Sequence, residues 1–180
     1  MTDCWQYNFP PFFTIQPNDE TRKRQMNAWC DIIVDHCAKN RIFVLNVGDC
    51  LKQQPFRNDS INRCLPEDGL IQILKEMETR DRIEWIHSDS KGKYSVGSES
   101  SCLVYWLKVE EWASMLMRWV QSNGLNNTIC TFYEIVDDER SSPDFAGLDE
   151  RILLKCVKYL EHNGDAVLMK MDDSYGVKFL

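Results

Sequence analysis

The same order of hydrophobic patterns occurs twice along the chain, and this repetition limits the folds that are open to it. The first copy begins near Asn18 or Asp19, either of which can cap a helix. The helix then carries apolar residues spaced three and four apart, a short strand follows at 42–45, and a second amphipathic helix is predicted over 66–80. The apolar face of the first helix consists of Met26, Trp29, Cys30, Ile33, Val34 and Cys37. Segments 83–87, 94–96 and 102–106 then predict a β-hairpin.

The second copy keeps this order. A helix with Trp112, Leu116, Trp119 and Val120 on one face ends at Gly124, which can terminate it. A short strand at 128–131 and a short helix at 132–136 follow, and Asp149 can cap another amphipathic helix that ends at Gly164. The segments 166–169 and 177–180 flank a turn and predict a second hairpin.

Helix, short strand, short helix, helix and hairpin form the plan of a winged-helix domain. The sequence therefore predicts an α+β protein with two tandem winged-helix domains, at 18–107 and 108–180, behind an N-terminal arm at 1–17. A single mixed α/β domain remains the alternative, because 180 residues suffice for one large core or two small ones.

The overall charge and the absence of targeting signals restrict the location and the partners. The formal net charge is −7, which disfavours nucleic acid, since affinity for phosphate backbones comes from clustered Lys and Arg. No apolar run approaches the roughly 20 residues of a membrane span, and the first residues do not form a secretory signal. The eight cysteines are scattered without a CxxC pair. We therefore expect a cytoplasmic protein with reduced thiols and no direct membrane insertion.

A DNA-binding regulator is the competing interpretation, because many winged helices place the helix before the wing in the major groove. The two helices in that position, 66–80 and 149–163, both begin with acidic residues, which would repel phosphates. The wings offer Lys91 and Lys93 in the first domain but Asp172 and Asp173 in the second. We expect no nucleic-acid partner.

An enzyme would need convergent reactive groups, and the sequence offers none. His36 and Cys37 are neighbours in a helix, so their side chains point about 100° apart and cannot form a nucleophile–base pair. No His, Cys and Asp cluster has zinc-ligand spacing, and no glycine-rich phosphate loop occurs. We predict that the chain is not an enzyme and holds no metal or cofactor.

The N-terminal arm carries the strongest binding signal. Its aromatic residues surround Pro10 and Pro11, which favour an extended polyproline II backbone that presents its neighbours to a groove. The arm could instead fold back over its own first domain. In an intermediate arrangement, Trp5 and Tyr7 pack on that domain while the later aromatics face a partner. A permanent partner is favoured, because five unpartnered aromatics would promote aggregation.

Several motifs in collinear order carry a resemblance to a known family. They are 5–18 (WQYNFPPFFTIQPN), 28–30 (AWC), 84–85 (EW), 110–112 (EEW), 126–127 (NN) and 175–180 (YGVKFL). Together they resemble the small, two-copy subunit of the ESCRT-II endosomal sorting complex over essentially the whole chain. The stretch 97–101 in the first wing is longer than in that family's pattern.

The resemblance implies two tandem winged helices and a scaffolding role. It implies that the arm binds the two larger ESCRT-II subunits, so that two copies form the limbs of a Y-shaped complex. It also implies that the second domain recruits and nucleates a coiled-coil subunit of ESCRT-III at the endosomal membrane surface, where ubiquitinated cargo enters multivesicular bodies. By position, the arm contacts fall on Phe9, Pro10, Pro11, Phe12 and Phe13. The ESCRT-III contacts fall on Thr128, Ile129, Cys130 and Thr131.

Overall fold

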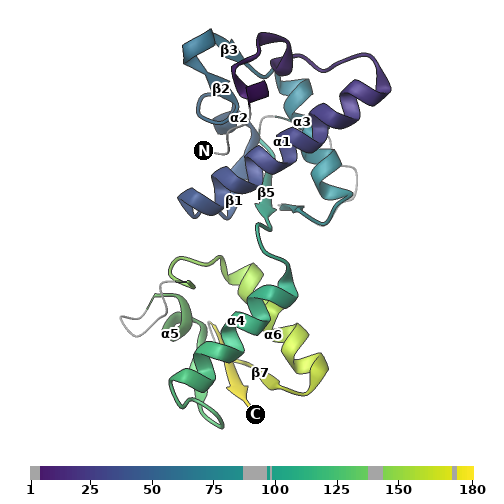
Figure 1. Cartoon of the computed structure of the whole chain (residues 1–180). Coiled ribbons are helices and arrows are strands. Elements are labelled where there is room, and N and C mark those ends of the chain that lie inside the picture. The colour runs from purple at the N-terminus through teal and green to yellow at the C-terminus, as the bar shows by residue number, and fades with distance from the viewer. Residues whose placement is uncertain (1–4, 87–96, 98, 138–143, 172–173) are drawn as a thin grey trace. The chain divides into compact units, whose positions relative to one another are not determined.

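The computed structural model divides the chain into two compact units, Met1–Trp106 and Leu107–Leu180. It describes residues 5–86, 97, 99–137, 144–171 and 174–180. The strand predicted at 94–96, both wing lysines of the first domain and the Asp172–Asp173 turn lie outside the described residues. Figure 1 shows both units and labels their α-helices and several of their strands.

The first unit builds one three-stranded antiparallel sheet, ordered β1-β5-β4, and a separate two-stranded ribbon of β2 and β3. Its long helix α1 lies against α3 (Figure 1). The ribbon was absent from the sequence prediction, because two residues per strand leave no period to detect. The elements are η1 (Trp5–Asn8), η2 (Pro10–Phe13), α1 (Asp19–Asn40), β1 (Val44–Asn46), α2 (Val47–Cys50), β2 (Arg57–Asn58), η3 (Asp59–Ile61), β3 (Arg63–Cys64), α3 (Glu67–Glu78), β4 (Ile83–Ile86) and β5 (Ser101–Val104).

Helix α1 begins where its sequence indicates. The Asn18 side chain caps it by accepting a hydrogen bond from the Thr21 amide at 3.1 Å. Arg41 ends it in the left-handed conformation, with φ of 53°. Five of the six residues predicted for its apolar face are buried, and Val34 is half-buried. Gln25 is also buried on this face.

The second unit repeats the order of the first. Its sheet is antiparallel and ordered β6-β8-β7, and α4 lies against α6. The helix predicted at 132–136 is confirmed at its exact residues, since Thr131 forms a capping box with Glu134. The elements are α4 (Val109–Ser122), β6 (Ile129–Thr131), α5 (Phe132–Val136), α6 (Glu150–Asn163), β7 (Ala166–Lys170) and β8 (Tyr175–Phe179).

Equivalent residues start the short helices of the two units. Asn46 ends β1 and caps α2, and Thr131 ends β6 and caps α5 in the same way. Each of these strands pairs with the last strand of its unit, β5 or β8. The α+β fold is therefore confirmed, and both units have the element order and the three-stranded sheet of a winged helix.

The predicted extended arm is wrong. Trp5–Asn8 and Pro10–Phe13 form two 3₁₀ turns, with hydrogen bonds from Phe9 N to Gln6 O at 2.9 Å at the end of the first and from Thr14 N to Pro11 O at 3.1 Å at the end of the second. Proline fixes only φ, near −65°, a value that a 3₁₀ turn shares with polyproline II. Burial of the aromatics that follow decides between the two, and the arm belongs to the first unit.

Candidate partner-binding surfaces

Phe12 and Phe13 attach the arm to the core of the first unit. The Phe12 ring stacks on the buried Trp29 ring, with 4.7 Å between the centroids and 12° between the planes. Phe13 meets Trp29 edge-on at 5.3 Å. Phe12 is 5% exposed and Phe13 is more deeply buried. The prediction that these two residues contact a partner is therefore corrected. Their rings already fill a hydrophobic core, and removing either would leave a cavity.

Hydrogen bonds from two other segments hold the backbone of the arm. The amide of Gln25 donates to Phe12 O and Thr14 O, both at 2.8 Å, and its oxygen accepts from Gln16 N at 3.1 Å. The amide of Asn58 donates to Tyr7 O at 2.8 Å. In these contacts the side chains of Gln25 and Asn58 bind the main chain of the arm, so they add to the anchoring by the Phe12 and Phe13 rings.

The arm exposes an aromatic pair, Trp5 at the start of η1 and Phe9 between η1 and η2. Trp5 is 70% exposed and Phe9 is 49% exposed, and their ring centroids lie 6.1 Å apart. Pro11 is also exposed and Pro10 is half-buried. Of the five predicted arm contacts, the structure leaves Phe9 and the two prolines accessible. We call Trp5 and Phe9 the aromatic pair.

Sequence reasoning did not include Trp5 among the contacts. The intermediate arrangement that it considered placed Trp5 and Tyr7 on the domain and the later aromatics outside. In the structure, Trp5 is exposed, whereas Phe12 and Phe13 are buried. No local pattern separates these aromatics, because Phe12 and Phe13 are buried by contact with Trp29, which is remote in sequence, whereas Trp5 and Phe9 contact each other.

The segment predicted to bind ESCRT-III forms the edge strand β6 and the cap of α5. Ile129 is 52% exposed and Thr128 is exposed, whereas Cys130 is buried. The Thr131 hydroxyl accepts a hydrogen bond from Glu134 N at 3.2 Å. The prediction that Cys130 is one of the ESCRT-III contacts is corrected, because alternate residues of a strand face opposite sides and Cys130 faces the core.

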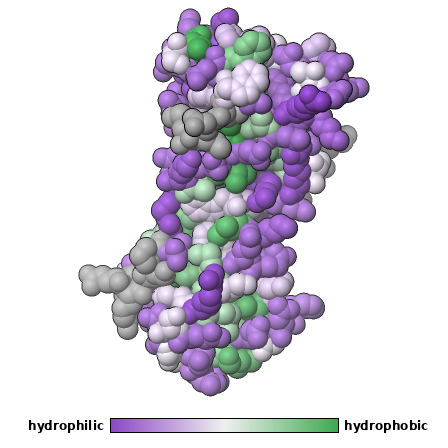
Figure 2. Space-filling view, in the orientation of Figure 1, coloured by the Kyte–Doolittle hydropathy of each residue, from purple (hydrophilic) through white to green (hydrophobic). Residues whose placement is uncertain are grey.

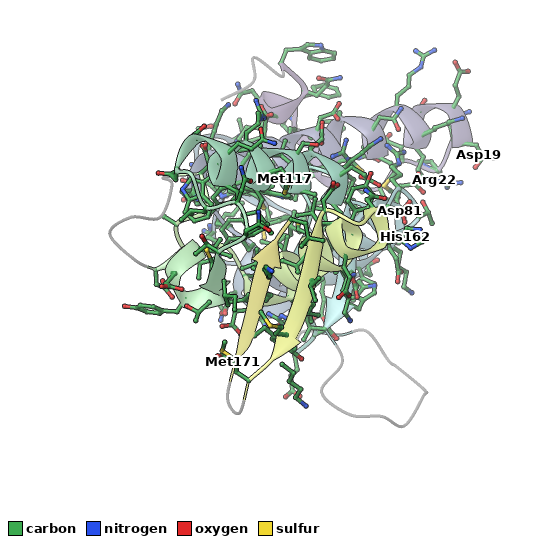
Figure 3. The ribbon with its side chains drawn as sticks, turned by 90° about the horizontal axis from the view of Figure 1, so that it is seen from below. Asp19, Arg22, Asp81, Met117, His162 and Met171 are labelled. Carbon is green, nitrogen blue, oxygen red and sulfur yellow. The ribbon has the colours of Figure 1, made fainter. Side chains whose placement is uncertain are left out.

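Two further exposed apolar residues lie near Ile129. Tyr133, on α5 and four residues further on, is 64% exposed. Val167 on β7 is exposed too, and it shares the row of Ile129 across the sheet, because both residues pair with Lys178 on β8. Figure 3 shows β7 and β8 side by side, with Met171 at the turn between them. The alternation of β7 would have indicated the outward direction of Val167 once its register was known.

The titratable groups form no reactive centre among the described residues. No group of three or more His, Cys, Asp or Glu residues there could hold a metal ion. Burial raises the pKa of Cys30 to about 11 and that of Cys37, Cys50 and Cys156 to about 12, so these thiols stay protonated and poorly nucleophilic. Burial lowers the pKa of His36.

The face of the molecule drawn in Figure 2 is mostly hydrophilic, with apolar residues in separate patches. Within the described part of the chain, no helix is long and apolar enough to cross a membrane. Small apolar patches of this kind can take part in contacts with other proteins.

Sequence comparison gives matches along nearly the whole chain. The family described as "ESCRT-II complex subunit" matches residues 6–149. Vacuolar protein-sorting-associated protein 25 of Drosophila melanogaster is 39% identical over 177 residues, covering 97% of this chain and 95% of the relative. The protein of the same name from Danio rerio is 35% identical over 176 residues, covering 97% and 96%.

Solved structures give the same result. A crystal structure of subunit VPS25 of the endosomal trafficking complex ESCRT-II superimposes with a TM-score of 0.83 at 26% identity, covering 97% of this chain and 96% of that one. A chain in the crystal structure of endosomal complex ESCRT-II (VPS22/VPS25/VPS36) gives a TM-score of 0.80 at 26% identity, with the same coverage. These matches do not favour the DNA-binding alternative, and they show that the chain belongs to the family of ESCRT-II complex subunits.

Proposed function

We propose that this chain is a non-enzymatic scaffold subunit that binds the two larger subunits of an ESCRT-II complex through its arm. The observation that carries the proposal is the aromatic pair, Trp5 and Phe9, exposed on a turn that is itself anchored in the core. The related chain of the VPS22/VPS25/VPS36 crystal structure supports it, since that chain is part of a complex with two other subunits.

The physical reason is that large aromatic side chains dominate binding energy at protein interfaces. Truncating a buried aromatic anchor at an interface hot spot typically costs about 2 kcal/mol or more of binding free energy. The pair offers two such anchors beside Pro11, and all three residues belong to a segment of defined backbone conformation. A groove on the partner that takes the pair would therefore gain affinity at a low ordering cost.

The test is to truncate the pair and measure assembly. Trp5→Ala and Phe9→Ala should each weaken binding to the co-expressed larger subunits by roughly thirtyfold, which corresponds to about 2 kcal/mol. Tyr159→Ala, at an exposed aromatic on α6, is the matched control and should bind as the wild type does. If Phe9→Ala and Trp5→Ala both co-elute with the larger subunits at wild-type affinity, the arm is not the attachment point.

We further propose that the second unit recruits an ESCRT-III subunit through a surface around Ile129. Thr128, Ile129 and Tyr133 are exposed there, while Cys130 and the capping role of Thr131 position them. Two copies of the chain in one complex would present two such surfaces, so a weak single contact would be strengthened by avidity. This recruitment would take place on the endosomal membrane surface during the sorting of ubiquitinated cargo into multivesicular bodies.

Ile129→Asp tests the second surface. The side chain is half-exposed, so the variant should keep the wild-type circular dichroism spectrum and the wild-type affinity for the larger subunits. It should lose recruitment of the ESCRT-III subunit in a reconstituted pull-down. Val44→Asp places the same charge at the equivalent exposed position on β1 of the first unit, and separates a local contact from a general charge effect. Normal recruitment by Ile129→Asp would place the ESCRT-III contact elsewhere.

A further inference from the structure

We propose that Gln25 and Asn58 are positioning residues: together they form a latch that holds the aromatic pair in its binding conformation before any partner arrives. The inference rests on the proposed function of the arm, and adds how the arm is presented. Neither residue belongs to the aromatic pair, and Asn58 lies on β2, about 50 residues further along the chain.

Burial singles out these two side chains. Among the described residues, Gln25 and Asn58 are the buried polar side chains, at 5% and 4% exposure. A buried amide needs hydrogen-bond partners, since an unpaired one is destabilising. Each amide nitrogen finds its main-chain acceptors in the arm: Phe12 O and Thr14 O for Gln25, and Tyr7 O for Asn58.

The two contacts hold the arm on both sides of Phe9. Asn58 binds the carbonyl of Tyr7, and the Tyr7 hydroxyl donates in return to Arg57 O at 3.1 Å, next to Asn58. Gln25 binds the segment 12–16. Local hydrogen bonds close the ends of the 3₁₀ turns in this segment: Phe9 N to Gln6 O and Phe12 N to Phe9 O, both at 2.9 Å, and Thr14 N to Pro11 O at 3.1 Å.

Short 3₁₀ turns are weak structures when isolated, so the conformation around Phe9 depends on its attachments. A free arm would lose conformational entropy on binding, and its affinity would fall accordingly. The latch removes that loss in advance. It should therefore change affinity without itself touching the partner.

Asn58 allows a substitution that removes the latch bond and keeps its other role. Its Oδ1 accepts from Ser60 N at 3.1 Å and from Ser60 Oγ at 2.6 Å, which caps η3. Asn58→Asp preserves these two acceptor contacts, and places an oxygen against the Tyr7 carbonyl in place of the donor. Gln25→Met keeps the length of the side chain and removes all three of its hydrogen bonds. Gln72→Met, at an exposed glutamine on α3, is the matched control.

The experiment measures the affinity of each full-length variant for the co-expressed larger subunits, together with hydrogen exchange of the arm amides. Gln25→Met and Asn58→Asp should each weaken binding by about tenfold. The amides of Phe9, Phe12 and Gln16 should exchange faster than in the wild type, while those of α3 should not change. Gln72→Met should match the wild type in both measurements.

A double-mutant cycle separates presentation from general loss of structure. If the latch acts by presenting Phe9, then adding Gln25→Met to Phe9→Ala should weaken binding by less than the tenfold seen for Gln25→Met alone. Full additivity would overturn the proposal, as would wild-type affinity of both latch variants while Phe9→Ala still fails to bind. If Phe9→Ala and Trp5→Ala bind normally, the proposed function itself fails and the latch has no binding role. Should Gln25→Met fail to fold, Asn58→Asp decides the outcome by the same criteria.

Discussion

Truncation of Phe12 should destabilise the first unit rather than act on partner binding alone. Its ring stacks on Trp29 and is 5% exposed, so Phe12→Ala removes a buried aromatic side chain and opens a cavity beside Trp29. The carbonyl of the same residue accepts from Trp29 Nε1 at 3.1 Å and from Gln25. The backbone contacts survive the substitution, so the cost isolates the ring.

The expected magnitude follows from the burial. A Phe→Ala change in a core typically costs about 3–5 kcal/mol of unfolding free energy, and this range includes the lost stacking on Trp29. A whole domain has about 5–15 kcal/mol of stability, so this is a large fraction of the total. With a urea dependence of about 2 kcal/mol per molar, the unfolding midpoint of the first unit should fall by roughly 1.5–2.5 M. Phe12→Ala combined with Phe13→Ala should leave that unit unfolded, contrary to the idea that both rings face a partner.

Urea denaturation followed by circular dichroism measures this change. Peptide-resolved hydrogen exchange assigns the transition to residues 5–106. Phe9→Ala is the matched control, since it removes the same ring from a half-exposed position, and should cost less than about 1 kcal/mol. Equal midpoints for Phe9→Ala and Phe12→Ala would refute the reasoning, and would mean that the arm is detached from the core in solution.

Three other perturbations test the structure. Among the described residues, Cys64 is the exposed thiol. In a chain with Cys4 replaced by Ser, a maleimide near pH 8 should therefore label Cys64 first, as followed by mass spectrometry. The further substitution Cys64→Ser should remove this fast phase of labelling. Gly164 ends α6 with φ of 83°, so Gly164→Ala should cost about 1 kcal/mol in urea unfolding, and an unchanged midpoint would contradict that backbone assignment. Burial lowers the pKa of His36 below its ordinary value of 6.5. Between the folded pKa and 6.5, the unfolded chain therefore binds more protons than the folded chain, and the free energy of unfolding falls as the pH drops through that window. His36→Gln should therefore lose less stability than the wild type between pH 7.5 and pH 5, and an equal loss would show that His36 is not the group responsible.

The elements that the sequence predicted well carry their own start and stop signals. Asn18, Thr131 and Asp149 each cap a helix within three residues, and Gly124 and Gly164 both adopt positive φ after their helices. Such signals act over a few residues, so they remain readable without tertiary information. The order of elements in the second unit follows from them directly.

The arm was predicted wrongly because its conformation is decided over a distance. The Pro10–Pro11 pair is compatible with an extended chain and with a 3₁₀ turn alike. Burial of Phe12 against Trp29 selects the turn, and Asn58 holds it from about 50 residues away. Neither contact leaves a periodic pattern in the sequence. The resemblance points to residues 9–13 as the candidate site, and these remote contacts set which of those residues are accessible.

The two copies of the fold differ in one row of residues across their sheets, although their short helices α2 and α5 are capped in the same way. In the first unit, the row across β1, β5 and β4 consists of Val44, Leu103 and Glu84, and its central leucine is buried. The equivalent row of the second unit is Ile129, Lys178 and Val167, in which a half-buried lysine separates two exposed aliphatic residues. Both copies keep a side-chain cap on the short helix, Asn46 or Thr131, whereas the residues of this row vary. An exposed aliphatic residue on each side of a cation suits a partner that brings both apolar and acidic groups. Both units thus expose an aliphatic residue on their first strand, Val44 or Ile129, and the second unit differs from the first by having Lys178 and Val167 beside it.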